Sequence, residues 1–511
     1  MIADVCLLLE GTYPYVAGGV ASWVHQLIGD LTTVKFALVH IGASEEAERL
    51  LKYPLPRNVV ELREVFLHEP LPRPRRMPKP VLGPRDWAVL RDFHAGLASG
   101  DYSAFGSLVC EVFSPGRVPL VELAYGLEAW DFLLEQYGRR GEGPSFIDYF
   151  WTWRFTHLPL VRALSARVPE ARCYHAVSTG YAGVMAAAAR LRRPSAMLLT
   201  EHGIYTRERR LEIAHAGWIP DAGEDDLALS DREGFFRAWW ERLFSALSRI
   251  AYRTADRITT IYEGNRLMQV AEGADPARIR VIPNGVEVEA YAGLRPSDLP
   301  GDQPVIALVG RVVPIKDVKT FIRAAAEVHR VRPEARIWVL GPTEEDPEYY
   351  ADCLALVRTL ELEEVVEFRG KVDLKQALAE VDLLVLTSIS EGQPLVILEA
   401  MAAGIPCVAT DVGACRELIE GVGPKDRALG SAGFVTPVGA PEPTAAALLQ
   451  LLADAPRYQA CARAARERVR RSYRASLVSA RYQEIYEELP LLAELGAGVG
   501  RPESAEATWQ A

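Results

Sequence analysis

Short apolar runs separated by longer amphipathic stretches recur along most of the 511-residue chain. Runs such as 305–310 and 381–387 are almost continuously apolar, which is typical of strands buried on both faces of a parallel sheet. Because helical periodicity fills most of the intervals, the pattern predicts two successive sets of alternating strands and helices. The expected strands are 5–11, 36–42, 59–65, 173–177, 196–201, 257–262 and 280–282 in the first set, and 305–310, 337–341, 365–370, 381–387, 406–411 and 433–437 in the second.

The alternation of strands and helices stops once, and a linker later separates the two sets. Strand-like runs are absent between about 66 and 170, where a proline-rich and basic loop at 71–85 precedes helical periodicity from 86 to about 166, so we expect a helical insertion at about 66–170 in the first domain. Its aromatic cluster at 146–155 is expected in the core, with an acceptor or partner surface as the alternative. The polar, proline-bearing stretch 294–304 marks the linker. The sequence therefore predicts two doubly wound α/β domains at 1–295 and 303–470, an amphipathic helix at 471–492 and a disordered tail at 496–511.

Composition excludes several classes of protein. With 68 acidic against 57 basic residues the net charge is −11, which argues against a nucleic-acid partner. The seven cysteines are far apart and include no C-x-x-C pair, so we expect reduced, mostly buried thiols. The N-terminus lacks the basic segment of a signal peptide, and no apolar run reaches the roughly 18 residues of a membrane span. These features predict a cytoplasmic protein whose membrane association would depend on a partner.

The stretch SISEGQPLVILEAMAA at 388–403 reads as a turn and a helix N-terminus that follow a buried strand. Pro394 suits the first position of the helix, and free backbone N–H groups there can bind an anion such as pyrophosphate. Glu391 in the turn and Glu399 further along the helix would reach different parts of one extended ligand. Since carboxylates accept hydrogen bonds from hydroxyls, this arrangement suggests a nucleotide-sugar, with two solvated carboxylates as the alternative.

Further candidate residues follow other predicted strands, where ligands of open parallel sheets bind. Arg311 and Lys316 follow the first strand of the second domain, and two cations there could neutralise a leaving pyrophosphate. His202 stands just past a strand of the first domain. Gly18 and Gly19 open a helix after the first strand, which suits either close approach of a ligand or a tight turn without one. Each residue alone has an ordinary structural explanation, and their combination with the Glu391 turn favours a site.

These motifs occur in an informative order along the chain. The series is Gly18-Gly19, His202, Pro283-Asn284-Gly285-Val286, Gly310-Arg311 with Lys316, Phe368-x-Gly370, and Glu391 with Glu399. It resembles the retaining glycosyltransferases of family 4, which have the GT-B fold. The N-terminal stretches LLLEGTYPYVAGGVASWVHQLI and TEHGIYTRERR are similar to the PelF-like branch, which serves synthesis of the Pel exopolysaccharide. The resemblance covers nearly the whole chain apart from its C-terminal tail.

The resemblance implies two Rossmann-like domains that face a cleft, with the N-terminal one as the acceptor domain and the C-terminal one as the nucleotide-sugar-binding domain. It also implies a C-terminal helix that crosses back to the N-terminal domain. It implies that Arg311 and Lys316 hold the donor diphosphate, and that Glu399 binds the ribose hydroxyls. By the same resemblance Glu391 meets the donor sugar, His202 lies beside the transferred sugar, and the backbone near Arg369 contacts the base. The expected catalytic residues are His202, Arg311, Lys316 and Glu391, and the expected donor-binding residues are Gly18, Gly19, Asn284, Arg369, Gly392, Gln393, Pro394, Leu395 and Glu399.

The implied activity is transfer of a hexose from a UDP-sugar, with UDP-glucose favoured, to a growing Pel-type exopolysaccharide. No D-x-D spacing occurs in the chain, so we expect neither a catalytic metal nor another cofactor. Since the sequence offers no obvious carboxylate nucleophile, we expect retention by front-face attack, with the donor phosphate as the base. The resemblance also implies docking on an inner-membrane complex. The alternatives are a UDP-sugar epimerase of the same fold, a non-catalytic sugar-nucleotide-binding scaffold, and a phosphorylase that would hold pyridoxal.

Overall fold

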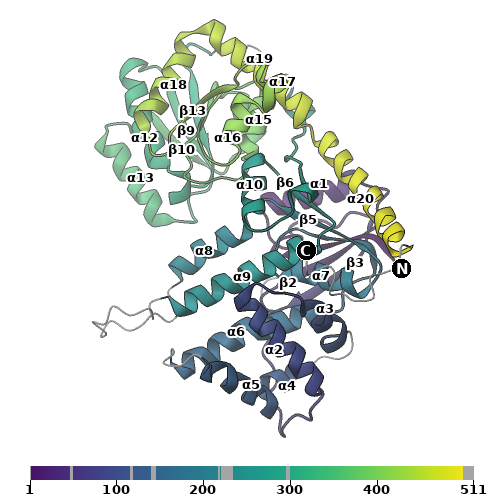
Figure 1. The fold of residues 1–511 in the computed structure, drawn as a ribbon. Coiled ribbons are helices and arrows are strands. Elements are labelled where there is room, and N and C mark those ends of the chain that lie inside the picture. The colour runs from purple at the N-terminus through teal and green to yellow at the C-terminus, as the bar shows by residue number, and fades with distance from the viewer. Residues whose placement is uncertain are drawn as a thin grey trace. The chain divides into compact units, whose positions relative to one another are not determined.

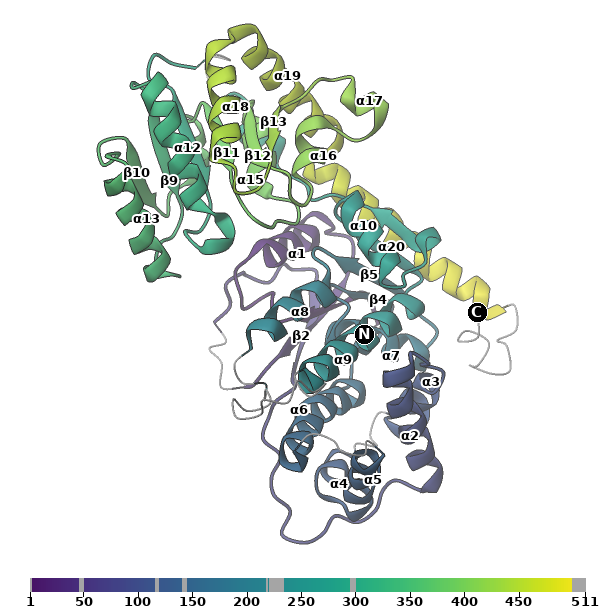
Figure 2. The same ribbon diagram turned by 60° about the vertical axis from the view of Figure 1, so that its left-hand side comes forward.

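The structure is a computed structural model that describes residues 2–45, 50–114, 119–139, 145–216, 219, 234–294 and 300–498. The chain forms two compact units (Figure 1, Figure 2). Unit 1 comprises Met1–Thr260, Arg266–Arg280 and Tyr482–Ala511, and unit 2 comprises Ile261–Asn265 and Val281–Arg481. All seven cysteines are free, and all except Cys110 are buried, as the sequence predicted.

The boundary between the units differs from the predicted linker at 294–304. Unit 2 already begins its long segment at Val281. Val286 forms a parallel bridge with Arg474, and its N–H donates to the carbonyl of Tyr473 at 2.8 Å. This pairing attaches the segment to unit 2, whereas the expected first domain, 1–295, includes it. Residues 295–299 of the predicted linker lie outside the described residues.

Unit 1 contains a seven-stranded sheet in the order β3-β2-β1-β4-β5-β6-β7. Its strands are β1 (Ala3–Glu10), β2 (Phe36–Gly42), β3 (Val59–Phe66), β4 (Ala171–Ala176), β5 (Ala196–Glu201), β6 (Arg257–Thr260) and β7 (Ile279–Val281). Neighbours from β3 to β6 pair in parallel, and Val5 lies between Phe36 and Cys173. The apolar run in β1 is buried along most of its length, as a central strand requires.

Helices pack around this sheet, and a helical insertion follows β3. The helices outside the insertion are α1 (Gly19–Asp30), α7 (Tyr181–Arg192), α8 (Tyr205–His215), α9 (Phe235–Thr254) and α10 (Glu263–Ala271), with a short 3-10 helix at Pro276–Arg278. The insertion contains α2 (Pro84–Ser99), α3 (Phe105–Ser107), a π-helical turn at Leu108–Val112, α4 (Leu120–Tyr125), α5 (Leu127–Gly138) and α6 (Phe146–Ser165). Both views show α2, α4, α5 and α6 grouped at one end of unit 1 (Figure 1, Figure 2). Along α6, Tyr149 and Trp153 are buried, whereas Trp151 and Phe155 are half exposed, so only one face of the aromatic cluster belongs to the core.

Unit 2 contains a six-stranded, fully parallel sheet in the order β10-β9-β8-β11-β12-β13. Its strands are β8 (Val305–Val309), β9 (Arg336–Leu340), β10 (Val366–Gly370), β11 (Leu383–Leu386), β12 (Cys407–Thr410) and β13 (Gly433–Thr436). Its helices are α11 (Val288–Tyr291), the 3-10 helix η3 (Pro314–Lys316), α12 (Val318–Val331), α13 (Pro347–Thr359), α14 (Leu374–Leu378), α15 (Leu395–Ala403), α16 (Cys415–Glu420), α17 (Gly423–Arg427), α18 (Pro441–Ala453) and α19 (Ala455–Ser472). Helices lie on both sides of the sheet (Figure 1).

The order of strands reverses at one point in each sheet. In unit 1 the reversal lies between β1 and β4, and in unit 2 it lies between β8 and β11. Loops that leave the carboxyl ends of two such strands run to opposite sides, which leaves a crevice where ligands of doubly wound sheets bind. The two sheets confirm the predicted α/β class with two Rossmann-like domains.

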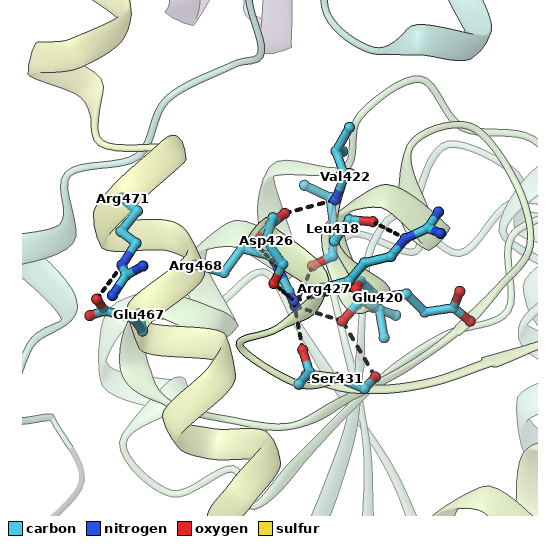
Figure 3. A network of polar contacts seen from close by, with 12 residues as sticks. Leu418, Glu420, Val422, Asp426, Arg427, Ser431, Glu467, Arg468 and Arg471 are labelled. Carbon is cyan, nitrogen blue, oxygen red and sulfur yellow. Dashed lines mark hydrogen bonds and ion pairs between the residues drawn. The ribbon is translucent and has the colours of Figure 1, made fainter. Parts of the chain in front are cut away.

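A buried arginine holds the C-terminal part of unit 2 together (Figure 3). Arg468 of α19 has a side chain with no exposed surface, and its Nε donates to Asp426 Oδ1 at 2.9 Å. Its terminal nitrogens donate to the backbone carbonyls of Ile419 at 2.7 Å and Gly430 at 2.6 Å. Since the guanidinium has five N–H donors, this one side chain bonds to α17, to α16 and to the loop before β13.

The helix α20 (Ala475–Gly498) is divided between the units. Its residues up to Arg481 belong to unit 2, and those from Tyr482 belong to unit 1. In unit 1 the hydroxyl of Tyr486 lies 2.7 Å from Nδ1 of His175, and both side chains are buried. The helix extends past the predicted end at 492. Most of the predicted tail, 496–511, lies outside the described residues.

Candidate active site

Lys316 and Glu391 meet at the point of strand reversal in unit 2. Lys316 ends the 3-10 helix η3 after β8, and Glu391 lies in the turn between β11 and α15. The ammonium is 2.5 Å from Glu391 Oε1, and Ser388 Oγ donates to the same oxygen at 2.6 Å. The two side chains are 21% and 13% exposed, so the ion pair is largely shielded from water. A cation and a hydroxyl-binding carboxylate are thereby held together where the fold favours a ligand.

Arg311 stands one loop away and has a different partner. It follows β8, as predicted, but its guanidinium pairs with Glu345 in the loop after β9. Both side chains are about half exposed, which leaves Arg311 accessible at the edge of the sheet. The backbone of Gly310, the residue before Arg311, lies close to Gly341, the residue after β9. A Cβ built on Gly341 would lie 2.0 Å from the Gly310 carbonyl oxygen. The two loops that carry Arg311 and Glu345 are therefore in close backbone contact.

A second glycine fixes the turn at 391–395. A Cβ on Gly413 would lie 2.2 Å from the carbonyl oxygen of Gly392, and Gly413 has φ +53, which favours glycine. The Gly392 carbonyl accepts from the N–H of Ala414 at 2.8 Å. Leu395 is the first residue of α15, and Pro394 is its N-cap, one position before the predicted one. The expected seat for an anion at the start of this helix remains a prediction.

Gln393 has a structural role that the sequence did not indicate. Its side-chain oxygen accepts from the backbone N–H of Asn284 at 2.6 Å, and both residues are buried. This bond joins the turn before α15 to the Pro283-Asn284-Gly285-Val286 segment. The Gln393 amide oxygen therefore already accepts a hydrogen bond within unit 2. To contact a bound nucleotide-sugar, this oxygen would have to give up its bond to Asn284.

Glu399 lies on α15, and its partner is Tyr291 at the end of α11. The tyrosine hydroxyl donates to Glu399 Oε1 at 2.9 Å. Burial raises the pKa of Glu399, and the bond from Tyr291 opposes this shift. Burial, followed by the charge of Glu399, raises the pKa of Tyr291 in turn, so the hydroxyl stays protonated and donates. Tyr291 positions the carboxylate.

Arg369 interrupts the regular pairing of β10. The register between β10 and β9 shifts between Phe368 and Gly370, and Gly370 has φ +62. The guanidinium of Arg369 lies 4.0 Å from the ring centroid of Trp338, and it pairs with Glu367 at 3.4 Å. The side chain is thus fixed within the sheet, which leaves the irregular backbone at Arg369 as the group for the predicted contact with a base.

Gly18 and Gly19 are exposed at the start of α1, beyond the carboxyl end of β1. A Cβ built at either position would meet no atom within 4 Å, and Gly18 has extended backbone dihedral angles that any residue adopts. Packing within the described part of the chain therefore does not require glycine here. The open backbone suits close approach of another molecule.

His202 lies in the turn between β5 and α8, as predicted. Its ring packs at 70° against Trp23 of α1, with 4.6 Å between centroids. Burial lowers the pKa of His202 to about 4, so the imidazole is neutral at pH 7. The preceding residue, Glu201, anchors the turn, because its carboxylate accepts from Tyr252 at 2.5 Å and from Gln269 at 2.9 Å.

The structure thus brings together part of the predicted constellation. Lys316, Glu391 and Glu399 share one edge of the unit 2 sheet and the adjacent helix, with Arg311 on the neighbouring loop, whereas Gly18, Gly19 and His202 belong to unit 1. Sequence reasoning missed Tyr291, Gly413 and Trp23, which hold Glu399, the turn and His202. Only Gly413 had a usable signal, the glycine that follows the strand at 406–411.

Two properties of the described residues bear on other kinds of site. In the ranges described above, no group of three or more His, Cys, Asp or Glu side chains could hold a metal ion. None of the described helices combines the length and apolarity that crossing a membrane demands.

Comparison with known proteins assigns the two halves of the chain to two family models. A model described as a domain of unknown function, DUF3492, matches residues 3–277, and one described as glycosyl transferases group 1 matches residues 303–454. The first match covers more than half of the chain. The second lies within unit 2, which carries Lys316, Glu391 and Glu399.

Individual relatives match over part of their length. The D-inositol 3-phosphate glycosyltransferase of Kineococcus radiotolerans is 34% identical over 229 residues, which are 42% of this chain and 53% of that protein. The N-acetyl-alpha-D-glucosaminyl L-malate synthase of Bacillus anthracis is 33% identical over 173 residues, which are 34% of this chain and 42% of that protein. This chain therefore spans about half the length of the curated relatives it matches.

A solved structure matches over almost all of this chain. The crystal structure of Anabaena HepE in complex with UDP and glucose aligns with a TM-score of 0.57 and 16% identity, covering 95% of this chain and all of that one. At such identity the likeness concerns the fold. The two parallel sheets and the likeness to this structure show that the chain has the GT-B fold. Because the first family model covers more than half of the chain and glycosyl transferases group 1 match its C-terminal part, the chain belongs to the DUF3492 family, joined to a group 1 glycosyl transferase domain.

Proposed function

We propose that this chain is a retaining, metal-independent glycosyltransferase that moves a hexose from a UDP-sugar, with UDP-glucose favoured, to a Pel-type exopolysaccharide acceptor. The observation that carries the proposal is the Lys316–Glu391 pair at the point of strand reversal in unit 2. The match of this unit to glycosyl transferases group 1 supports glycosyl transfer. HepE, solved with UDP and glucose, supports the choice of donor.

Unit 2 binds the donor in this proposal. The Lys316 ammonium and the N-terminus of α15 stabilise the negative charge that develops on the leaving diphosphate. Glu391 accepts hydrogen bonds from hydroxyls of the donor sugar. Glu399, positioned by Tyr291, accepts hydrogen bonds from the ribose, so the two carboxylates hold opposite ends of the donor.

The transfer step follows from these charges. The bond between the anomeric carbon and the diphosphate oxygen breaks, and its electron pair leaves with UDP. The acceptor hydroxyl forms the new bond to the anomeric carbon on the same face, and its proton passes to a diphosphate oxygen. His202 of unit 1 is neutral at pH 7 and contributes a hydrogen bond beside the transferred sugar without changing the charge.

Calorimetric titration of the full chain with UDP-glucose, UDP-N-acetylglucosamine, GDP-mannose and ADP-glucose tests the donor. We expect selective binding of UDP-glucose without added metal, weakened in Glu399→Gln. Glu420→Gln is the matched control, because Glu420 is an exposed carboxylate paired with Arg416 at 2.8 Å. Equal binding of all four nucleotide-sugars would contradict the donor assignment and favour the scaffold interpretation.

Product analysis separates transfer from epimerisation. An epimerase would convert UDP-glucose into a second UDP-sugar without an acceptor, which NMR of the reaction mixture would reveal. A transferase releases UDP and lengthens the acceptor. The PelF-like assignment, with docking on an inner-membrane complex, rests on the N-terminal stretches, and we expect this chain to restore Pel polysaccharide in a strain that lacks its PelF. If the purified chain transfers sugar but does not restore Pel polysaccharide in that strain, its acceptor belongs to a polysaccharide other than Pel.

A further inference from the structure

Unit 1 contains a cavity of about 370 Å³ at its own point of strand reversal. The cavity is lined by Glu10, the last residue of β1, by Tyr181, the first residue of α7 after β4, and by Tyr205, the first residue of α8 after β5. Ligands of doubly wound sheets bind at such a point, and small-molecule sites usually measure roughly 300 to 1,000 Å³. Position and size both fit a site for one or two sugar rings.

Glu10 provides a fixed acceptor in this cavity. The hydroxyl of Tyr205 donates to Glu10 Oε1 at 3.1 Å. The N–H of Ala182, in the first turn of α7, donates to Oε2 at 3.3 Å, and Ser178 Oγ is 3.4 Å from the same atom. Because these contacts orient the carboxylate and each of its oxygens can accept two hydrogen bonds, Oε1 can also accept from a ligand hydroxyl. Glu10 is partly exposed, so a ligand can reach it.

Aromatic rings form the wall of the cavity. Tyr181, Tyr205, Trp240 and Phe244 line it, and each is less than a tenth exposed. Trp240 and Phe244 are stacked with centroids 5.7 Å apart, and Phe244 meets Tyr205 edge to face. A pyranose ring has C–H faces that pack on aromatic rings and hydroxyl edges that need acceptors and donors. An aromatic wall beside a carboxylate therefore matches a saccharide better than it matches a purely apolar or a purely charged ligand.

The charges at the cavity exclude one class of acceptor. Arg209 lines it, but its guanidinium pairs with Glu212 at 2.8 Å, and Glu212 lines it too. His68, a further lining residue, is neutral at pH 7 because burial lowers its pKa. The charges of Glu10, Glu212 and Arg209 sum to −1 when all three are ionised, and burial, which raises the pKa of Glu10, shifts this sum towards zero. In neither case does the lining supply the surplus cation that a phosphate or carboxylate ligand requires.

We propose that this cavity binds the terminal sugar of an uncharged saccharide acceptor, with Glu10 as the hydroxyl acceptor and the four aromatic side chains as the platform. The inference rests on the proposed function, which it deepens by naming the chemical class of the acceptor. It distinguishes this chain from transferases that act on phosphorylated or carboxylated acceptors.

Saturation-transfer NMR and calorimetry on the full chain with UDP test the proposal. The probes are the neutral disaccharides cellobiose, maltose and lactose, and the anions D-inositol 3-phosphate and L-malate, each at millimolar concentration. We expect at least one neutral disaccharide to bind, and both anions to bind about tenfold more weakly or not at all. In Glu10→Gln, disaccharide affinity should fall about tenfold or more, because the amide replaces one of the two carboxyl oxygens and a hydrogen bond to the saccharide is lost. Tyr205→Phe should give a smaller loss in the same direction.

Glu170→Gln is the matched control. Glu170 directly precedes β4, at the opposite edge of the same sheet from Glu10, and it lines a different cavity of about 400 Å³. Saccharide affinity unchanged in Glu170→Gln and reduced in Glu10→Gln supports the site, provided that thermal unfolding shows both variants folded. Tighter binding of the phosphate, equal losses in the two variants, or no binding of any neutral disaccharide while UDP still binds would overturn the proposal. Loss of UDP binding by the unaltered chain would instead overturn the proposed function.

Discussion

Replacing Lys316 by methionine removes a cation that unit 2 holds at the carboxyl ends of β8 and β11. Its side chain is 21% exposed and its ammonium is 2.5 Å from Glu391, so its charge acts in a medium between water and a dry interior. Two unit charges 4 Å apart interact by about 4 kcal/mol at an effective dielectric constant of about 20. Removal of one preorganised donor to a developing anion costs about 3 kcal/mol. Since about 1.4 kcal/mol changes a rate tenfold, turnover should fall by about a hundredfold or more.

The assay for Lys316→Met is UDP release from UDP-glucose at saturating donor. Lys319→Met is the matched control, because Lys319 on α12 has a similar exposure of 29% and pairs with Asp352 at 2.8 Å. The variant also leaves Glu391 without its cation, so a Lys316→Met/Glu391→Gln double variant separates the two effects. We expect the double variant to regain thermal stability but not turnover. Turnover within about twofold of the unaltered chain in Lys316→Met, with donor still bound, would refute the assignment of Lys316 to the leaving group.

Four further predictions concern unit 2. In urea unfolding, Arg468→Met should lower the free energy of unfolding of unit 2 by about 4 kcal/mol, because Asp426 and two backbone carbonyls lose their donor in the interior. The control Arg471→Met removes an exposed ion pair with Glu467 and should cost under about 0.5 kcal/mol. Gly413→Ala should lower the melting temperature and weaken UDP binding about tenfold, because the added methyl group would lie 2.2 Å from the Gly392 carbonyl oxygen. An unchanged melting curve would show that the turn can shift to accommodate the methyl group. UDP affinity should fall as the pH decreases from 7 towards 5, because burial raises the pKa of Glu399 and a protonated carboxyl group accepts hydrogen bonds poorly. In calorimetric titrations, the UDP affinity of Glu399→Gln should not show this pH dependence. The raised pKa also means that the ionised Glu399 destabilises the fold, so Glu399→Gln should unfold at higher urea than the unaltered chain at pH 7. This difference should shrink as the pH falls through the raised pKa of Glu399 towards 4.5, below which the carboxyl is protonated in both the folded and the unfolded chain.

The sequence predicted the strands well because burial on both faces demands an unbroken apolar run. The run at 381–387 and the observed β11, Leu383–Leu386, agree for that reason, and the glycine and proline signals around α15 marked its ends within one residue. The helical insertion was visible because strand-like runs stop after β3 and resume at β4. Patterns that depend on neighbours in the chain were therefore predictable.

Features that depend on distant pairing were not predictable. The unit boundary at Val281 follows from the bridge between Val286 and Arg474, which no local pattern announces. The bond from the Asn284 N–H to Gln393 likewise joins two segments far apart in the chain. Glu399 was singled out from its spacing, yet its partner Tyr291 lies in a short helix without any motif. The functional roles of all the predicted site residues, in unit 1 and in unit 2, stay predictions.

The division of the chain has a consequence for recombination between related enzymes. Covalent continuity passes from one unit to the other four times, after Thr260, Asn265, Arg280 and Arg481. A chimera cut once in the proline-bearing linker would therefore exchange Val286 and its neighbours with the wrong unit, and would separate them from Arg474. Exchange of the whole of unit 2 requires junctions at Arg280 and Arg481, with the segment Ile261–Asn265 replaced together with it. Recombination that exchanges a whole unit therefore needs paired junctions, whereas loop changes within one unit need no such coordination.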